Sequence, residues 1–460
     1  MTQTLQCISP IDGSIYAERP TLDEAAASSA AASARNAQAD WAARPLSERV
    51  ALVLAGVARL GEMNDEIVPE LAHMMGRPVR YGGEFGGVEE RASHMARIAK
   101  EALAPLEIEG SERFRRVIKR EPHGVVFVVA PWNYPYMTAI NTVAPALIAG
   151  NTVILKHATQ TLLAGERLAR AFHEAGVPEA VFANVFLDHD TTSKLIGARA
   201  FDFVNFTGSV GGGKAMERAA AGTFTPLGLE LGGKDPGYVM EDADLDAAVA
   251  TLMDGAMFNS GQCCCGIERI YVHESLFDAF VGKAVETAKA LKLGNPLDPG
   301  TSLGPMAHRR FADEVRAQIS EAVAAGATAL LDPLPEDDGG TYLSPQILTG
   351  VTHDMRVMRD ESFGPVVGIM PVSDDDEAIR LMNDSIFGLT ASLWTPDVER
   401  AEHLGARIET GTVFLNRADY LDPGLCWTGC KMTGRGGALS VIGYQNLTRP
   451  KSYHLKKVTS

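Results

Sequence analysis

The chain has 460 residues, 46% of them hydrophobic, so about two or three domains are expected and disorder of the whole chain is excluded. Its 42 Lys and Arg against 58 Asp and Glu give a formal net charge of −16, which argues against broad binding to nucleic acid or anionic membranes. No apolar run approaches the ~18–20 residues that span a bilayer, Met1–Leu5 lacks a signal-peptide pattern, and six cysteines are too few for a disulfide framework. We therefore expect a soluble enzyme of the reduced cytoplasm.

The first hundred residues have a helical pattern. Ala25–Ala43 is rich in alanine, Ser47–Asn64 begins at a serine ahead of an apolar run, and a further helix is expected up to Gly76. The glycines within 82–87 interrupt the pattern, which resumes as a helix that ends near Leu103.

From His123 onward, short strands alternate with helices. The expected strands are Val125–Ala130, Thr152–Leu155, Val181–Phe186, Phe201–Phe206 and Pro226–Leu231. The expected helices between them are Met137–Ile148, Thr161–Ala175, Thr191–Ala198 and Gly211–Ala221. This alternation predicts a parallel, doubly wound sheet, and such sheets bind ligands at the carboxyl ends of their strands.

A second α/β unit follows the first. Its expected elements are the helix Leu245–Asn259, the strand Ile267–Val272, the helix Leu276–Leu291, the strand Val366–Met370, the helix Asp374–Asn383, and the strands Thr390–Trp394 and Val413–Asn416. Between them, 293–349 carries many Pro, Gly and Asp residues, which predicts longer loops.

Three consecutive cysteines, Cys263, Cys264 and Cys265, follow a Gly-Gln turn at the end of an expected helix. A free cysteine is usually an inert core residue, but a turn at a helix end is a poor place to fill a core and can activate a thiol. A metal site that adds Cys426 and Cys430 is the other reading. Because no pair of histidines accompanies their spacing, we expect no metal.

Glu230 ends an apolar strand ahead of Gly232-Gly233. Burial there would raise the pKa of its carboxyl into the range of a general base. The alternative is a salt bridge to Lys234, four residues later.

Two more segments follow expected strands. Asn133, held between Trp132 and two prolines, can offer a rigid amide to a developing oxyanion, or can be an ordinary turn residue. The glycine turn at Gly208-Ser209 joins a strand to a helix, which is a natural phosphate cradle although it is not a G-x-G-x-x-G fingerprint.

Together these segments resemble the aldehyde dehydrogenase superfamily, in order and through nearly the whole chain. The resemblance rests on Pro131–Pro135, Lys156, Gly208-Ser209, Glu230–Lys234, Gly261–Cys264 and Glu361–Pro365.

The resemblance implies an oxidation of an aldehyde to the acid with NAD or NADP. It makes Cys264 the nucleophile, Asn133 the oxyanion donor, and Glu230 the base that activates water against the thioester. The cofactor contacts that it implies are Trp132, Lys156, Thr159, Gly208, Ser209 and Glu361.

Two departures from the family pattern bear on specificity. Thr159 stands where many NAD-preferring members carry a Glu that repels a 2′-phosphate, so the sequence does not exclude NADP. The segment Leu425–Lys431 replaces the usual Pro-Phe-Gly-Gly stretch near the substrate tunnel. The candidates for the lining of this tunnel are Tyr134, Met137, Cys263, Cys265, Tyr420 and Trp427. For an aldehyde that bears a carboxylate, the candidate arginines are Arg417 and Arg435.

The resemblance also implies the domain organisation. A dinucleotide-binding domain is expected at 1–108 and 123–231, a catalytic domain at 232–442, and a small β oligomerisation ribbon at 109–122 and 443–460. The polar, alternating segment Glu112–Glu121 predicts an exposed hairpin or an interface strand. In the family such a ribbon pairs with a neighbouring subunit, so we expect a homodimer or a dimer of dimers.

Three other functions compete with this interpretation. They are a semialdehyde dehydrogenase of the succinate-semialdehyde type or a CoA-acylating relative, a non-catalytic member, and a thiol hydrolase. CoA-acylating members typically lack the base glutamate, so Glu230 argues against that reading. The intact Cys264 and Asn133 argue against a non-catalytic protein, and no Cys–His–Asn pairing points to a hydrolase.

Overall fold

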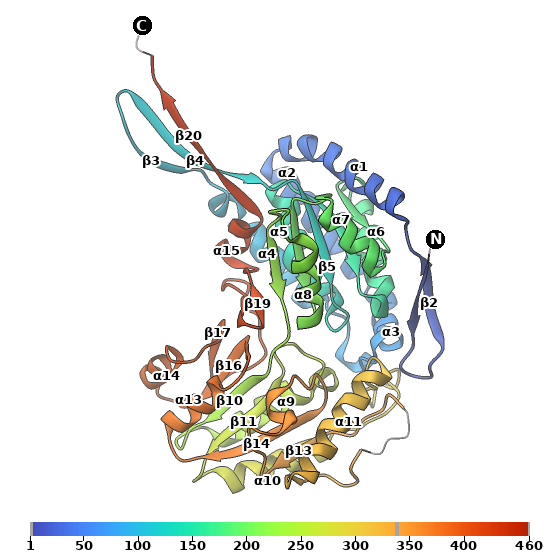
Figure 1. Cartoon of the computed structure of the whole chain (residues 1–460), viewed down its shortest axis with the longest axis vertical. Coiled ribbons are helices and arrows are strands. Elements are labelled where there is room, and N and C mark those ends of the chain that lie inside the picture. The colour runs from blue at the N-terminus through green and yellow to red at the C-terminus, as the bar shows by residue number, and fades with distance from the viewer. Residues whose placement is uncertain (1–2, 336–339, 459–460) are drawn as a thin grey trace.

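The computed structural model describes residues 3–335 and 340–458. Two α/β bodies are stacked on one another, and a thin three-stranded ribbon projects from one end (Figure 1). The ends of the predicted ranges at residues 1–2 and 459–460, and residues 336–339 of the predicted loop region, lie outside the described residues. Within the described part of the chain, no helix is long and apolar enough to cross a membrane.

The first body contains a six-stranded sheet of order β19-β9-β8-β5-β6-β7. Its parallel strands are β5 (Val125–Ala130), β6 (Thr152–His157), β7 (Phe182–Asn184), β8 (Phe203–Thr207) and β9 (Leu227–Glu230). Its helices are α1 (Glu24–Ala43), α2 (Leu46–Glu62), α3 (Asn64–Met75), α4 (Phe85–Ala102), α5 (Pro135–Ala149), α6 (Leu162–Glu174), α7 (His189–Gly197) and α8 (Val210–Ala220). The five predicted strands and the doubly wound parallel sheet are confirmed.

The central strand β5 shows why this sheet is covered on both faces. All six of its residues are buried. Val126 and Val128 belong to the core that includes residues of α2, α4, α5 and α6. Val125 and Phe127 belong to the core that includes residues of α1, α7 and α8. Alternate side chains of a strand point to opposite faces, so a continuous β-branched run requires helices on both sides.

The second body contains a seven-stranded sheet of order β12-β13-β14-β11-β10-β16-β17. The strands are β10 (Asp235–Val239), β11 (Ile267–His273), β12 (Thr328–Ala329), β13 (Gln346–Thr349), β14 (Val366–Val372), β16 (Thr390–Trp394) and β17 (Thr412–Leu415). The helices are α9 (Leu245–Met257), α10 (Phe277–Lys289), α11 (Arg309–Ala324), α12 (Arg356–Arg359), α13 (Asp375–Asn383) and α14 (Val398–Gly405). All pairs are parallel except β12 with β13.

Several elements differ from the sequence predictions. The chain begins with an antiparallel hairpin, β1 (Thr4–Ile8) and β2 (Ile15–Pro20), where only helix was expected. The predicted loop region 293–349 contains the sixteen-residue helix α11, whose buried Ala312, Val315, Ile319 and Ala322 repeat at helical spacing. The predicted loops lie on both sides of α11 within the described residues, and the helix was missed because its periodic signal lies between stretches rich in Pro, Gly and Asp.

Strand β10 was also missed, because its sequence Asp-Pro-Gly-Tyr-Val consists largely of poor strand formers. In the structure all five of its residues are buried between β11 and β16. The carboxylate of Asp235 accepts hydrogen bonds from the amide and the hydroxyl of Thr390, at 3.1 and 2.6 Å. The neighbouring strand β16 therefore stabilises β10 in the interior of the sheet, although the Asp-Pro-Gly sequence of β10 is typical of edge strands and turns.

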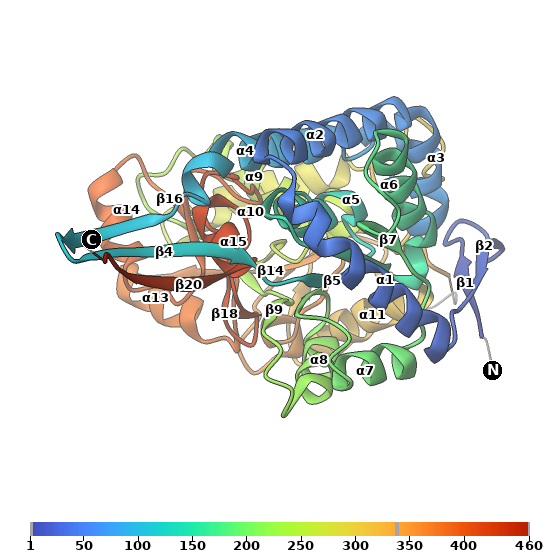
Figure 2. The same cartoon turned by 90° about the horizontal axis from the view of Figure 1, so that it is seen from above.

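The ribbon consists of β3 (Leu106–Ser111), β4 (Phe114–Pro122) and β20 (Thr448–Lys456) in the order β20-β4-β3. The two ranges predicted for the ribbon, 109–122 and 443–460, pair with each other through β4 and β20, with Ile118 opposite Ser452. From above, the ribbon and the hairpin β1–β2 lie at opposite ends of the molecule (Figure 2).

The C-terminal part of the predicted catalytic range 232–442 lies against the first body. β19 (Gly434–Arg435) pairs with β9, and Trp427 and Leu439 belong to the same core as α4 and α5. The helix α15 (Ser440–Asn446) crosses the predicted limit at 442 and adds Tyr444 to this core. Two further short strands, β15 (Phe387–Gly388) and β18 (Cys430–Lys431), pair with each other. This part of the range therefore joins the two bodies, and the domain limits themselves stay a prediction.

Candidate active site

A cavity of about 240 Å³ lies where α4, α5, the end of β9 and the cysteine turn meet. Eight of the residues that the sequence singled out line it: Cys264, Glu230, Tyr134, Met137, Cys263, Cys265, Tyr420 and Trp427. They come from five separate segments of the chain, so the fold brings together the predicted nucleophile, the predicted base and all six predicted lining residues.

The turn that carries the cysteines is strained. After α9 ends, Asn259, Ser260 and Gly261 have φ of 54°, 57° and 68° in succession. Such values are unusual for residues other than glycine, and they persist where the surroundings hold them. At Gly261 a Cβ would lie 2.2 Å from the carbonyl oxygen of Gly364, so only glycine fits. The Ser260 hydroxyl donates to the carbonyl of Gly304 at 2.8 Å.

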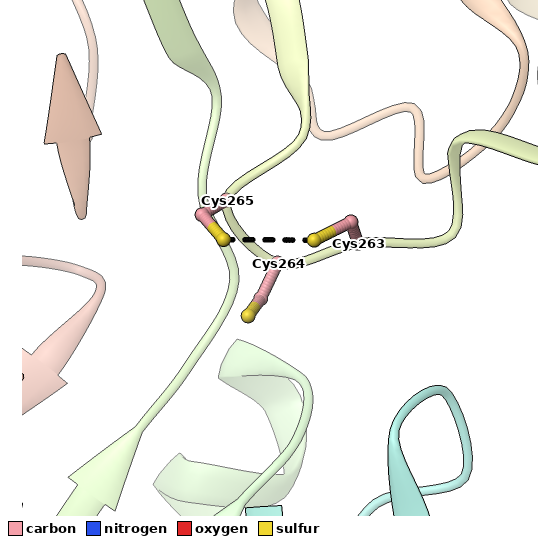
Figure 3. A group of neighbouring side chains, drawn as sticks. All are labelled: Cys263, Cys264 and Cys265. Carbon is pink, nitrogen blue, oxygen red and sulfur yellow. Dashed lines mark hydrogen bonds between the residues drawn. The ribbon is translucent and has the colours of Figure 1, made fainter. Parts of the chain in front are cut away.

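The three thiols have different surroundings (Figure 3). The side chains of Cys263 and Cys265 face one another with their sulfurs 3.5 Å apart, whereas that of Cys264 points away from this pair. Both paired thiols donate to Oδ1 of Asp419, at 3.4 and 2.9 Å. The neighbouring side chains of Cys263 and Cys265 lower the pKa of Cys264 below its ordinary value, while the pKa of Cys263 and of Cys265 is raised. Cys264 is therefore the thiol most easily ionised.

The carboxyl of Glu230 lies at the end of β9, facing the same cavity. Its Oε2 accepts a hydrogen bond from the hydroxyl of Thr207 at 3.5 Å. Burial raises the pKa of Glu230 to about 7, and nearby Arg91 works against this shift. The alternative salt bridge to Lys234 is wrong, because Lys234 Nζ binds Glu268 Oε2 at 2.6 Å and Ser362 Oγ at 2.9 Å.

Asn133 lies behind the cysteine turn, with only 4% of its surface exposed. The Nδ2 of Asn133 donates to the backbone carbonyl of Gln262 at 3.2 Å, and the backbone carbonyl of Asn133 accepts a hydrogen bond from Nδ2 of Asn259 at 3.3 Å. The side chain therefore connects the segment after β5 to the turn that carries Cys264, which distinguishes it from an ordinary exposed turn residue.

A buried ion pair that the sequence did not reveal holds this arrangement together. Arg77 Nη1 contacts Glu84 Oε1 at 2.7 Å, and Nη2 of the same arginine donates to the Asn133 carbonyl at 2.6 Å. Oε2 of Glu84 accepts the backbone N–H groups of Tyr136 and Met137 at the start of α5. A carboxylate there satisfies N–H groups that a helix start leaves unpaired. A charged pair so far from the motifs gave no local signal in the sequence.

The predicted cofactor residues lie at the carboxyl edge of the first sheet and beside it, outside the lining of the cavity. Lys156 is near the end of β6, Thr159 follows it, and Gly208-Ser209 follows β8. Ser209 caps α8, with its Oγ accepting from Gly212 N at 3.2 Å. Burial lowers the pKa of Lys156 to about 8. This edge is where doubly wound sheets bind nucleotides.

The two remaining cofactor candidates, Glu361 and Trp132, lie where the two bodies meet. Glu361 Oε1 accepts the N–H of Gly233 at 3.0 Å, and burial together with the charge of Glu268 raises the pKa of Glu361 to about 8. The Trp132 ring stacks on Phe311 of α11, with centroids 5.1 Å apart.

Neither arginine that the sequence offered for a substrate carboxylate reaches the cavity. Arg417 stacks on the Tyr420 ring at 3.5 Å, and Arg435 pairs with Glu217 at 3.0 Å. Arg91 of α4 lines the cavity instead, together with Asp419. Neither residue was predicted from the sequence. For Arg91, the helical pattern of α4 shows that its face is buried but does not show that this face lines the cavity.

Comparison with known proteins agrees with the site. The model of the aldehyde dehydrogenase family matches residues 1–453. A succinate-semialdehyde dehydrogenase [NADP(+)] of Deinococcus radiodurans is 32% identical over 96% of this chain and 93% of its own. The structure of an NADP-dependent glyceraldehyde-3-phosphate dehydrogenase from Bacillus halodurans C-125, complexed with NADP, is similar with a TM-score of 0.93 and 32% identity over 99% of this chain and 96% of the other.

A third similar structure has a different cofactor. An indole-3-acetaldehyde dehydrogenase in complex with NAD+ has a TM-score of 0.94 and 30% identity over 99% of this chain and 94% of the other. The match to the family model spans both bodies and nearly the whole ribbon. The chain therefore belongs to the aldehyde dehydrogenase family and is an NAD(P)-dependent oxidoreductase that acts on an aldehyde.

Proposed function

We propose that Cys264 is the nucleophile of this enzyme, that Glu230 is its general base, and that Asn133 stabilises the oxyanion. The shared cavity carries the proposal, because the Cys264 thiol and the Glu230 carboxyl line the same small space. The pKa of the thiol is lowered and that of the carboxyl is raised. Near neutral pH the Cys264 thiol can therefore ionise to the nucleophilic thiolate, and the Glu230 carboxyl can both take up and release a proton as a general base does.

The reaction begins when the Cys264 thiolate attacks the aldehyde carbon. The carbonyl oxygen becomes the alkoxide of a thiohemiacetal, and the second proton of the Asn133 amide, which the bond to Gln262 does not use, stabilises it. When bound, NAD(P) would supply the acceptor for the hydride of the adduct carbon, so that Cys264 would then carry the thioester. Glu230 then takes a proton from a water molecule that attacks the thioester carbon. The carboxylic acid departs and the Cys264 thiolate returns.

The groups at the carboxyl edge of the first sheet fit NAD or NADP. Lys156 is 5% exposed and forms no ion pair within the described residues, so its ammonium is available to ribose hydroxyls. Gly208-Ser209, at the start of α8, would hold the pyrophosphate, and Glu361 the nicotinamide ribose. Trp132 would flank the cleft. Thr159 offers a neutral hydroxyl where a carboxylate would exclude a 2′-phosphate.

The experiment that tests these roles compares Cys264→Ser with Cys263→Ser and Cys265→Ser as matched controls. An alcohol of much higher pKa does not ionise at neutral pH, so Cys264→Ser should lose at least about a thousandfold in kcat. Its affinity for NAD and NADP, measured by fluorescence titration, should stay close to that of the wild type. If a control variant is the inactive one while Cys264→Ser retains turnover, the assignment is wrong.

A semialdehyde dehydrogenase of the succinate-semialdehyde type is a second candidate for the finer function. The similarity to the Deinococcus radiodurans enzyme favours it. The CoA-acylating alternative is disfavoured by Glu230, whose position in the cavity suits attack by water. Assays with and without CoA separate transfer to CoA from hydrolysis.

We further propose that the chain forms a homodimer or a dimer of dimers in the cytoplasm. Among the described residues, β3 and β20 each pair only with β4, so the ribbon has two open edges. All six residues of β3 are exposed. Pairing with a second subunit would satisfy an open edge.

A further inference from the structure

Arg91 is a buried cation inside the substrate cavity. It lies on α4, is only 8% exposed, and lines the same space as Cys264 and Glu230. It is the one Lys, Arg or His among the residues that line this cavity. A guanidinium stays charged at neutral pH even where burial lowers its pKa, as it does here.

The contacts of Arg91 leave much of its hydrogen-bonding capacity unused. Its Nη1 donates to two neutral acceptors, the carbonyl of Met137 at 3.0 Å and Oδ1 of Asn141 at 3.3 Å. Within residues 3–335 and 340–458, its Nε and Nη2 donate to no acceptor, and no carboxylate forms an ion pair with it. Burying an unpaired charge is costly, so the site is incomplete without an anion.

The neighbouring amide has the same deficit. Asn141 also lines the cavity, and its buried Nδ2 has no hydrogen-bond partner in the described part of the chain. Arg91 and Asn141 are already joined through Oδ1, so two donor groups with unused N–H groups lie side by side on one wall. Such donors suit a carboxylate, which accepts several hydrogen bonds at once.

The acidic groups around the cavity do not neutralise Arg91. The carboxylate of Glu90 accepts the hydroxyl of Tyr420 at 2.6 Å in an exposed position. Asp419 accepts the thiols of Cys263 and Cys265, and burial raises its pKa well above its ordinary value. Burial lowers the pKa of Arg91, and the charges of Glu84 and Glu230 act on it in the opposite direction and raise its pKa. Glu84 is paired with Arg77 and Glu230 accepts the hydroxyl of Thr207, and neither forms an ion pair with Arg91. No carboxylate of the described protein therefore takes the place of an incoming anion.

We propose that Arg91, assisted by Asn141, binds a carboxylate of the substrate, so that the preferred substrates are short aldehydes bearing a carboxylate at the far end. This inference rests on the proposed attack by Cys264, which fixes where the aldehyde end lies. The cavity volume of about 240 Å³ is small for a ligand site, which favours a short chain. A neutral aldehyde of the same shape would leave the guanidinium buried without a partner.

The first test uses the wild-type enzyme with two aldehydes of matched shape, 4-oxobutanoate and the neutral 4-methylpentanal. Hydrogen bonds to a charged group contribute about 1.5–3 kcal/mol, so kcat/KM should favour 4-oxobutanoate by about tenfold to a hundredfold. Equal values, or a preference for the neutral aldehyde, would overturn the inference without any variant.

The second test changes the arginine. Arg91→Met should lower the kcat/KM ratio of 4-oxobutanoate to 4-methylpentanal by about tenfold to a hundredfold, mainly through KM, and Arg91→Lys should recover part of it. Arg97→Met is the matched control, because Arg97 lies on the same helix in an exposed position and contacts His94. Thermal unfolding checks that each variant is folded.

The outcomes separate the possible roles of Arg91. A parallel loss for both aldehydes in Arg91→Met, with their ratio unchanged, would show a structural role and refute the inference. If Arg91→Met does not fold, the ratio in Arg91→Lys and the wild-type preference decide. Failure of the proposed function would give a different result. If Cys264→Ser stayed active, Cys264 would not be the nucleophile, whereas the preference of the wild type between the two aldehydes would be unchanged.

Discussion

Substitution of Glu230 by Gln removes the proposed base while preserving the size of the side chain. Because the thioester would form but lack a group to activate water, we expect a burst of reduced cofactor followed by turnover at least about a hundredfold slower, the usual contribution of a positioned base. Stopped-flow absorbance at 340 nm separates the burst from the steady state. Steady turnover equal to that of the wild type would remove Glu230 from the mechanism, and a burst smaller than one equivalent would mean that Glu230 also prepares Cys264.

The pH dependence of wild-type turnover tests the role of Glu230 as a base without any substitution. With a pKa of about 7, the Glu230 carboxyl is mostly ionised one pH unit above this value and about 10% ionised one unit below it. If hydrolysis limits turnover, kcat should fall by about tenfold per unit below pH 7. The Glu230→Gln variant should lose this acid limb. A wild-type profile that is flat between pH 5.5 and 8 would contradict the assignment.

Stability should change in the opposite direction to activity. The pKa of Glu230 rises from 4.5 in the unfolded chain to about 7 in the fold, so the folded state binds more protons and loses stability as the pH rises between these values. At about 1.4 kcal/mol per unit, the loss above pH 7 is about 3 kcal/mol as an upper value. Glu230→Gln should therefore unfold at a higher temperature than the wild type at pH 8, with the difference shrinking toward pH 4.5. Calorimetry at the two pH values is the measurement; a variant that is less stable at pH 8 refutes the burial argument.

Two further predictions concern the cofactor and the assembly. Thr159→Glu should lower kcat/KM for NADP relative to NAD by at least about tenfold, because a carboxylate opposes the 2′-phosphate, and Thr159→Gln is the neutral control; an unchanged ratio would place the residue away from the ribose. Deletion of the residues after Arg449 removes most of β20 and should weaken both assembly and thermal stability, as followed by light scattering and calorimetry. A fully active full-length monomer of about 49 kDa at micromolar concentration would contradict the proposed oligomer.

Much of the fold follows from local sequence. β5 and the helices around it have the periodicities of a buried parallel strand and of amphipathic helices, and the structure confirms them. Glu230 and the three consecutive cysteines were also singled out without a structure, because a carboxyl at a strand end and thiols after a Gly-Gln turn are unusual enough to indicate chemistry. The family resemblance then implied Cys264 among the three. The common cavity of Glu230 and Cys264 follows from the same fold, in which chemistry gathers at the carboxyl ends of parallel strands.

Only the tertiary structure shows the features that depend on contacts between residues far apart in the sequence. β10 is a strand because it pairs with β11 and β16, and Thr390 of β16 satisfies its buried Asp235. Arg77 donates directly to the Asn133 carbonyl and pairs with Glu84. That Arg91 has no ion-pair partner among the described residues is visible only once the surrounding wall of the cavity is known. The sequence shows which charges exist, but whether a charge is paired, solvated or left for a substrate is an energy that depends on every neighbour in three dimensions.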